Sequence, residues 1–452
     1  ESFYFISDAG RDAQAAFKII IDHKLTLIGP RASVAGFFLG PFYFYLITIP
    51  LWLLRMDPIG LAYFSSFLGV LAVFLVYLVA KRLFDTLAGL VAAFLYAVSP
   101  IVIDHSRMAW NPSPVPLFTL LLLLGLILFK STKQLRWLIL SWVVGGLGVQ
   151  LHYTFAYLFL PLLVWLFIIR KSLGQWLKDL VFGLGIFLFL NSTLIIFDLR
   201  HNFLTSRAFF EFLLGDKVSF GLGNFFSNYI KIVNEVFNLT ILSGLITPLR
   251  VAIILGLLGL LLAKKNWGQS IFLLLLMFLL SVFVFSFFNE TIQLYYYNFL
   301  LPFPVLLVSC VVSTLGRIKY LKYLIFLFPV IFFWFNLKSN LNPTRPPRTL
   351  EQIRQVSLSI VERVPQGTSF NIAAFSDEPW YTAEEYRYFS YYFGRRAEGP
   401  ENYKDIQKLF VISSKPMDDP LMIQSQETVE FGATKIEESW VAGSMRIFQL
   451  SR

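Results

Sequence analysis

Charged side chains and cysteine are both scarce in this sequence of 452 residues. Charged residues make up 15% of the chain and apolar residues 56%, which leaves too little polar surface to cover a soluble globule of this length. Most of the chain must therefore be solvated by lipid. Cys310 is the only cysteine and lies in an apolar run, which excludes disulfides and a thiolate metal site.

Three sequence patterns are also missing. The chain begins at Glu1 without Met and without a signal-peptide pattern, so we expect a helix to precede it. No internal repeat is visible, whereas transporters tend to carry paired repeats. Residues 348–452 contain no Gly-rich phosphate loop and no HExxH pattern, which argues against a second catalytic centre in that region.

Long apolar runs dominate what is present. A transmembrane helix needs about 20 mainly apolar residues, and the runs between the charged clusters approach that length. The sequence therefore predicts a polytopic α-helical membrane protein. We expect spans at residues 61–80, 86–102, 115–130, 137–150, 153–169, 180–197, 249–263, 269–288, 296–315 and 322–336.

Basic residues lie in short clusters that bound these apolar runs. The formal net charge is +10, but clusters at helix ends favour membrane topology over nucleic-acid binding, so we expect no nucleic-acid partner. If the clusters are cytoplasmic, the opposite helix ends face the outside of the cell membrane. The clusters are Lys81/Arg82, Lys130/Lys133/Arg136, Arg170/Lys171, Lys264/Lys265 and Arg317/Lys319/Lys322.

Two outer segments follow from this alternation. Residues 36–54 are apolar, but a crossing there would reverse the charge bias of every later loop, so we expect them to be partly embedded without crossing. Residues 1–60 then form the first outer loop. Residues 199–247 form another, and their mixed polar and apolar content predicts amphipathic helices on the membrane surface.

The composition changes abruptly at residues 341–347, a Pro-rich linker that ends a transmembrane domain of residues 1–340. Residues 348–452 predict a small extracytoplasmic α/β domain. Its expected elements are helices at 350–364 and 382–393 and strands at 369–375, 408–413 and 438–450, the last with a turn at 442–444.

A first group of candidate site residues precedes an apolar helical pattern near the N-terminus. If this segment is helical, Asp8 and Asp12 share one face and Arg11 lies beside Asp8. The alternative interpretation is a helix cap with a local ion pair, which is the commoner role of such residues.

A second group lies at the outer end of a predicted span. Polar residues so near the lipid boundary are costly unless they line a wet cavity. Trp110 is also explained as an interfacial anchor, and Asn111 with Pro112 as a turn. The candidates in this group are Asp104, His105, Arg107 and Asn111.

Further candidates lie at other outer helix ends. His152 stands between two short predicted helices, and a buried histidine bonded to a carbonyl is a fair alternative for it. Asp198, Arg200 and His201 have the alternative of being ordinary loop residues. Carboxylates, imidazoles and guanidiniums that converge on one side of the membrane can bind an anionic headgroup and remove a proton from an acceptor.

Four features resemble integral-membrane glycosyltransferases of the GT-C fold, in particular the group of protein O-mannosyltransferases and lipid A aminoarabinose transferases (glycosyltransferase family 39-like). They are the acidic loop around Asp8, the segment Gly40-Pro41-Phe42-Tyr43-Phe44-Tyr45-Leu46, Ser106-Arg107 with Trp110-Asn111-Pro112, and an extracytoplasmic tail. The resemblance covers most of the chain, and each motif is moderately specific.

This resemblance implies transfer of a sugar from a polyprenyl-phosphate-linked donor to an acceptor outside the cell membrane. Asp8 takes the position of the catalytic acid in the first outer loop, with Asp12 in reserve. Arg and His side chains would bind the phosphate, and Tyr43, Tyr45 and Tyr295 would stack on the sugar or pack against the lipid.

The sequence departs from the family pattern at two places. Ala9 follows Asp8 where the family often has a second acidic residue, and Asn111 stands near another acidic position. These departures leave open whether a divalent metal takes part and which residue is the base. The acceptor, whether a glycan, a lipid or a protein, is also open.

Two other classes of protein fit parts of the sequence. A lipid or polysaccharide transporter would also have many helices and a polar cavity, but its ionisable residues tend to lie near the midplane of the membrane. A membrane scaffold with an outer binding domain would explain the tail, but it leaves the acidic and histidine clusters unexplained.

Overall fold

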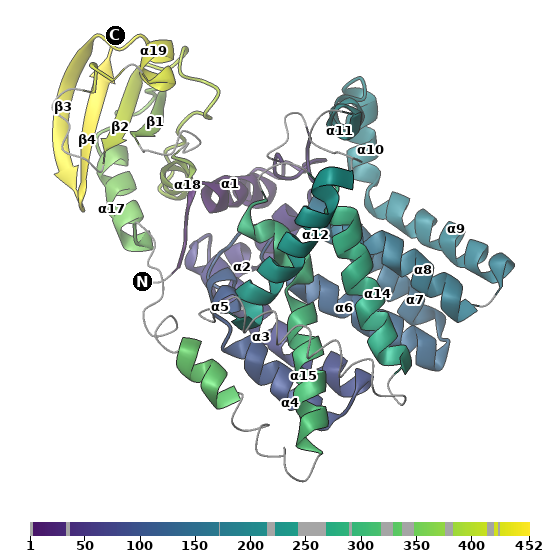
Figure 1. The fold of residues 1–452 in the computed structure, drawn as a ribbon. Helices are drawn as coiled ribbons and strands as arrows, with labels where there is room; N and C mark the ends of the chain where they lie inside the picture. The colour runs from purple at the N-terminus through teal and green to yellow at the C-terminus, as the bar shows by residue number, and fades with distance from the viewer. Residues whose placement is uncertain are drawn as a thin grey trace.

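The computed structural model describes residues 3–32, 37–170, 172–214, 222–242, 268–288, 292–317, 329–336, 348–375, 383–413, 420–423 and 425–452. In this part of the chain, a bundle of apolar helices carries a small sheet domain at one end (Figure 1). Helix α1 (Ser7–Ile21) lies where the two meet. The polytopic helical fold with a C-terminal sheet domain is therefore as predicted.

Five helical segments in the described residues are long and apolar enough to cross a membrane, and a bent pair of helices adds a sixth if it forms one span. The bundle consists of α2 (Phe42–Leu53), α3 (Ile59–Leu83), α4 (Thr86–Ala97), α5 (Pro100–His105), α6 (Val115–Thr132), α7 (Leu135–Leu151), η1 (Tyr153–Leu158), α8 (Phe159–Arg170), α9 (Leu173–Leu190), α10 (Ser192–Arg200), α14 (Gly268–Phe285), η4 (Leu294–Leu300) and α15 (Pro302–Gly316). The expected span at 249–263 and the start of that at 322–336 lie outside the described residues.

One predicted span is misplaced by about half its length. The sequence indicates a helix at 180–197, whereas α9 begins at Leu173 and ends at Leu190. Asp179 lies inside α9 because Arg170 neutralises it through bonds of 2.5 and 2.8 Å. The helix ends before Asn191, whose side-chain amide donates to the Phe187 carbonyl at 2.9 Å.

Helix α2 supports the prediction that residues 36–54 do not cross the membrane. Its 12 residues span about 18 Å, well short of a hydrocarbon core of about 30 Å. Tyr45 near its start exchanges hydrogen bonds with backbone groups of Thr26 in the first loop. The turn after it accepts a bond from Tyr388 of the sheet domain at the Met56 carbonyl. The start of α2 is therefore tied to the first loop, and the turn after it contacts the sheet domain.

Residues 199–247 contain the expected amphipathic helices in their described part, namely α11 (Leu204–Leu214) and α12 (Leu222–Phe237). A π-helical segment, η2 (Asn238–Leu242), follows α12. Ile232 and Val236 of α12 are fully buried, and α12 packs against α14. One side of α12 is thus covered by protein, whereas Phe226 and Ile230 are exposed.

The sheet domain has four strands in the order β1-β2-β4-β3. Strands β1 and β2 are parallel, and β4 is antiparallel to both β2 and β3. The elements are α17 (Leu350–Val361), β1 (Phe370–Phe375), α18 (Glu384–Tyr392), β2 (Lys408–Ser413), α19 (Gln426–Phe431), β3 (Lys435–Ala442) and β4 (Met445–Ser451). All five predicted elements appear, and the turn lies at Gly443, whose φ of +58° suits glycine. The six-residue helix α19 was not predicted, because it contains few apolar residues.

Helix α1 packs against α18 at very short range. A Cβ atom at Gly10 would lie 2.3 Å from the backbone nitrogen of Glu385, a distance that real side chains do not adopt. We expect Gly10→Ala to destabilise this contact by about 1–3 kcal/mol, the usual range for overpacking, and to lower the thermal unfolding midpoint in detergent. Gly185→Ala is the control, because no atom lies within 4 Å of that Cβ position. An unchanged midpoint for Gly10→Ala would contradict this packing.

Candidate functional site

The carboxylates of α1 share one guanidinium. Arg11 donates from Nη1 to Asp8 at 2.7 Å and from Nε and Nη2 to Asp12 at 2.9 and 2.7 Å. The Asp8 side chain is 45% exposed, whereas that of Asp12 is buried. The N-cap of α1 is Ile6, so Asp8 does not cap the helix. The alternative interpretation was a helix cap with a local ion pair. Only the ion pair is present, and Asp8 remains partly exposed to solvent.

Burial raises the pKa of Asp12 to about 7, although Arg11 lowers it in part and Asp8 and Glu384 raise it further. Its Oδ2 atom is buried without a hydrogen-bond partner among the described residues. The carboxyl group therefore holds a proton in the folded protein at pH values where it is ionised in the unfolded chain, and stability falls as the pH rises from about 4 to 7.

We expect Asp12→Asn to reduce this loss of stability. The substitution removes the group that must ionise on unfolding, so the variant should lose less stability than the wild type between pH 5 and pH 8. Thermal unfolding midpoints at the two pH values measure the difference. The same decrease in both proteins would show that Asp12 is ionised throughout this range.

A short backbone pairing joins the first loop to residues 104–113, which the sequence predicts to be outer and which we call the second outer loop. Tyr4 forms an isolated parallel bridge with Met108, and its N–H donates to the Arg107 carbonyl at 3.4 Å. Asp8 follows Tyr4 by four residues along the chain. The two groups of candidate residues, around Asp8 and around Arg107, are therefore tied together by main-chain contact.

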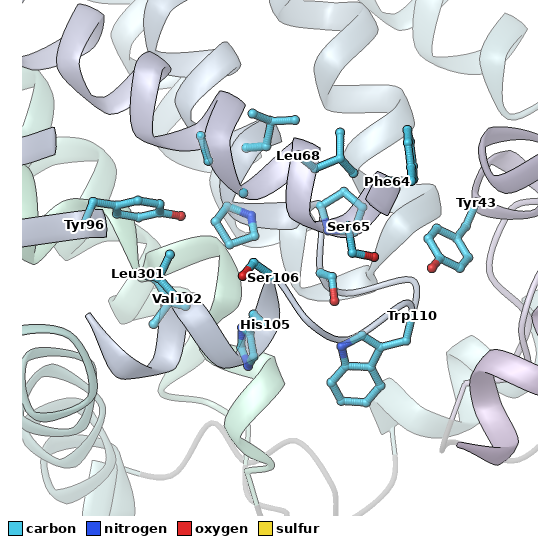
Figure 2. Close-up of a pocket in the computed structure, with 16 residues that line it drawn as sticks. Tyr43, Phe64, Ser65, Leu68, Tyr96, Val102, His105, Ser106, Trp110 and Leu301 are labelled. Carbon is cyan, nitrogen blue, oxygen red and sulfur yellow. The ribbon is translucent and has the colours of Figure 1, made fainter. Parts of the chain in front are cut away.

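A largely apolar pocket opens between α2, α3, α5 and the start of α6 (Figure 2). Tyr43 stands at one end of this pocket, and its hydroxyl lies within electrostatic range of Asp12, Arg11 and Asp8. Polar groups of the second outer loop lie along the pocket, among apolar side chains from α3 and the start of α6. The polar lining residues are Tyr43, Ser65, Tyr96, His105, Ser106, Trp110 and Ser113.

Three nitrogen atoms of the second outer loop are buried without a hydrogen-bond partner among the described residues. They are His105 Nδ1, Arg107 Nη1 and Trp110 Nε1. Arg107 Nη1 lies 3.5 Å from Asp104, which is an ionic contact but too long for a normal hydrogen bond. Buried polar groups are nearly always paired, so these three nitrogen atoms, close together in sequence, are available to donate to a ligand or to water.

Burial shifts the pKa values of His105 and Asp104 in this loop. It lowers the pKa of His105 to about 4, so the imidazole is neutral at pH 7 and donates one N–H. Burial raises the pKa of Asp104, with Arg107 acting in the opposite direction. Arg107 is therefore the cation of this loop, and His105 and Trp110 add neutral donors.

Four sequence candidates have structural partners. The Tyr45 hydroxyl binds the backbone of Thr26. Asn111 donates to the Leu151 carbonyl at 2.7 Å, and His152 Nδ1 lies 2.8 Å from the Thr154 hydroxyl. Tyr295 packs edge-on against Trp110 and His152. Of these residues, Asn111 and Tyr295 contact the second outer loop or belong to it. A role in binding remains a prediction for all four.

Arg200 and His201 lie at the end of α10, apart from the pocket lining. His201 is exposed, stacks on Phe197 and places Nδ1 2.7 Å from the Phe197 carbonyl. Asp198 is buried and accepts bonds from the backbone of Thr205 and Ser206, so it holds the start of α11. Contact of Arg200 or His201 with a ligand remains a prediction.

No group of three or more His, Cys, Asp or Glu side chains in the described residues is arranged to hold a metal ion. Arg11 stands between the carboxylates of Asp8 and Asp12, where a cation is required.

Sequence analysis missed the roles of several residues in this region. Trp110 was explained as a membrane anchor, yet it lines the pocket with an unpaired indole nitrogen. Ser65 also lines the pocket, and a serine within an apolar helix was the only signal for it. Glu384 of the sheet domain acts on the charges of Arg11 and Asp12 across 370 residues of sequence, and no local pattern indicated it.

Comparisons with known proteins agree with this arrangement. Residues 39–197, about a third of the chain, match the dolichyl-phosphate-mannose-protein mannosyltransferase family. No curated protein matches the sequence. The matched segment contains the pocket-lining parts of α2 to α6 and the second outer loop.

The fold is similar to that of solved membrane glycosyltransferases. ArnT from Cupriavidus metallidurans in the apo state has a TM-score of 0.63 and 9% identity, covering 99% of this chain and 94% of that chain. ArnT bound to undecaprenyl phosphate has a TM-score of 0.61 at the same identity and coverage. The apo oligosaccharyltransferase of Archaeoglobus fulgidus has a TM-score of 0.51 and 13% identity, covering 90% of this chain and 65% of that chain. The chain therefore has the GT-C fold, as its sequence motifs indicated.

Proposed function

We propose that this chain is a glycosyltransferase that moves a sugar from a polyprenyl-phosphate-linked donor to an acceptor on the extracytoplasmic side of the membrane. The observation that carries the proposal is the set of nitrogen atoms without a hydrogen-bond partner at His105, Arg107 and Trp110, beside a largely apolar pocket and joined by backbone contact to the segment that precedes α1. A lipid phosphate supplies both the acceptor oxygens and the apolar chain that such a site requires.

The donor would bind with its phosphate at the second outer loop. Arg107 supplies the positive charge, while His105 and Trp110 donate neutral hydrogen bonds. The lipid chain would lie along the apolar side chains of α3 and the start of α6 in the pocket. One solved protein of similar fold and the family match support this choice of ligand, since ArnT has been solved with undecaprenyl phosphate and the matched family carries the name dolichyl-phosphate-mannose.

Asp8 would act as the general base. Its carboxylate is partly exposed and held by Arg11, so it is accessible to an acceptor. It would take the proton of the acceptor nucleophile as this attacks the anomeric carbon, and the lipid phosphate would leave with its charge stabilised by Arg107. Asp12 is less suited to this role, because it is buried and retains a proton near pH 7.

The contacts at both ends of the bundle support an extracytoplasmic site. The sheet domain meets α1 and the α2–α3 turn, and α3 leads from there to Lys81 and Arg82 at its other end. Asp85, just beyond, pairs with Arg317 at the end of α15. Basic residues thus gather at the end opposite the sheet domain, as the positive-inside rule requires for a cytoplasmic face.

Activity with defined donors tests this proposal. Purified protein in nanodiscs would be incubated with a panel of undecaprenyl-phosphate-linked sugars and a membrane extract as the source of acceptors. Release of undecaprenyl phosphate from at least one donor is the expected result. A protein that binds no member of the panel and releases no undecaprenyl phosphate would contradict the proposed function.

Topology gives a separate prediction. We expect Val429→Cys in the sheet domain to react with a membrane-impermeant thiol reagent in intact cells, and Gln134→Cys between α6 and α7 to react only after the cells are opened. Both positions are exposed, and the native Cys310 is buried. Labelling of Gln134→Cys in intact cells would place the basic clusters outside and reverse the orientation.

A further inference from the structure

Two buried glutamates of α18 bind α1 on either side of the proposed base. The Gln14 amide donates to Glu384 Oε2 at 2.6 Å and to the Glu384 carbonyl at 3.0 Å. The Ser7 hydroxyl donates to Glu385 Oε2 at 3.2 Å. Ser7 precedes Asp8, and Gln14 follows Asp12. The segment of α1 that carries both carboxylates is therefore held at each end by neighbouring residues of α18.

Glu384 is itself fixed by the core of the sheet domain. Its carboxylate lies 3.6 Å from the guanidinium of Arg387, which is completely buried. Arg387 donates to Asn371 Oδ1 at 2.8 Å, and to the Ile372 carbonyl and the Tyr403 hydroxyl at 2.6 Å each. A continuous chain of polar contacts thus runs from strand β1 to α1. Side chains held in this way have little freedom to reorient.

Docking of the sheet domain does not explain why a carboxylate is buried here. Arg354 pairs with Asp57 at 2.7 Å, and Arg396 forms two bonds to Asp22 at 2.8 and 2.6 Å. These pairs already join the domain to the outer loop. The charge of Glu384, in contrast, lies close enough to Asp12 to raise its pKa, which is an unfavourable placement for mere attachment.

We propose that Glu384 is a positioning residue for the transfer reaction, an inference that rests on the function proposed above. Through its hydrogen bond to Gln14, Glu384 fixes the rotation of α1 about its own axis. That rotation sets the direction in which Asp8 and Arg11 face the second outer loop. The sheet domain thereby completes the active site without touching the substrate.

Separate measurements of turnover and lipid binding test the role of Glu384. A misplacement of about 1 Å can cost roughly 10²-fold in rate, so we expect Glu384→Ala to lower turnover by about 10–100-fold. Affinity for undecaprenyl phosphate should stay within about twofold of wild type, because the phosphate site lies on the second outer loop. Glu384→Gln can still accept the bond from Gln14, so it should keep most of the turnover.

Arg396→Gln is the matched control, since it removes a docking contact without altering the bond to Gln14. It should keep wild-type turnover. Should Glu384→Ala fail to fold, Gln14→Ala removes the same bond from α1 and must show the same separation of turnover from binding. The inference would be overturned if Arg396→Gln lost as much turnover as Glu384→Ala. It would also be overturned if Glu384→Ala lost turnover and lipid binding in parallel, or kept the turnover of the wild type. A wild-type protein without transfer or lipid binding would instead contradict the proposed function, and this inference with it.

Discussion

Replacement of Asp8 by Asn should abolish sugar transfer while leaving donor binding in place. Asn keeps the size of the side chain and can still accept a bond from Arg11, but it cannot take a proton. A general base contributes about 10²–10⁴-fold in rate, so a loss of turnover of this size is expected. The measurement is release of undecaprenyl phosphate from its sugar conjugate, made alongside binding of undecaprenyl phosphate itself.

Asp22→Asn provides the control for Asp8→Asn. Asp22 is the carboxylate that immediately follows α1, and it pairs with Arg396 rather than with the site. We expect this variant to transfer sugar at a rate close to wild type. Near-normal turnover by Asp8→Asn would exclude it as the base, whereas loss in both variants would indicate damage to α1 rather than to the chemistry.

Replacement of Arg107 by Gln should weaken binding of undecaprenyl phosphate by about 10–150-fold. A hydrogen bond to a charged group contributes about 1.5–3 kcal/mol, which corresponds to that range in the dissociation constant. Arg107 is the cation among the three unpaired donors of the second outer loop, so its loss removes the charge that replaces water at the phosphate. Binding to purified protein in detergent measures the effect without knowledge of the sugar.

Two further variants make the Arg107 result specific. Arg136→Gln removes an exposed positive charge from α7, and we expect it to bind undecaprenyl phosphate like the wild type. Arg200→Gln tests the sequence prediction that Arg200 or His201 also contacts the phosphate. If Arg107→Gln bound the lipid normally, Arg107 would not belong to the donor site.

The sequence was sufficient to predict most of the helices, because long apolar runs and charged ends are local signals. The break between α7 and η1 at His152 was also visible in the sequence. The position of α9 was not visible in the sequence, because the charged residues Lys178 and Asp179 suggested that the span begins after them. The ion pair of Asp179 with Arg170 across the turn that precedes α9 explains why the helix begins earlier.

Prediction of the site was limited because some of its properties depend on contacts between residues that are far apart in sequence. Asp8, Arg11 and Arg107 could be selected from local sequence, since acidic and basic residues at outer helix ends are conspicuous. The difference in exposure between Asp8 and Asp12 could not be predicted, because it arises from burial of Asp12 under α18. The contribution of Glu384 likewise depends on a contact between the first loop and the last domain.

The location of bound undecaprenyl phosphate tests the central claim most directly. A structure of the protein with this lipid should place the phosphate beside His105, Arg107 and Trp110 and the chain along α3, with the Asp8 carboxylate facing the phosphate. The three nitrogen atoms that are now unpaired should then bind its oxygens. A phosphate bound at the end of the bundle that carries Lys81 and Arg317, or anywhere remote from Asp8, would contradict the account.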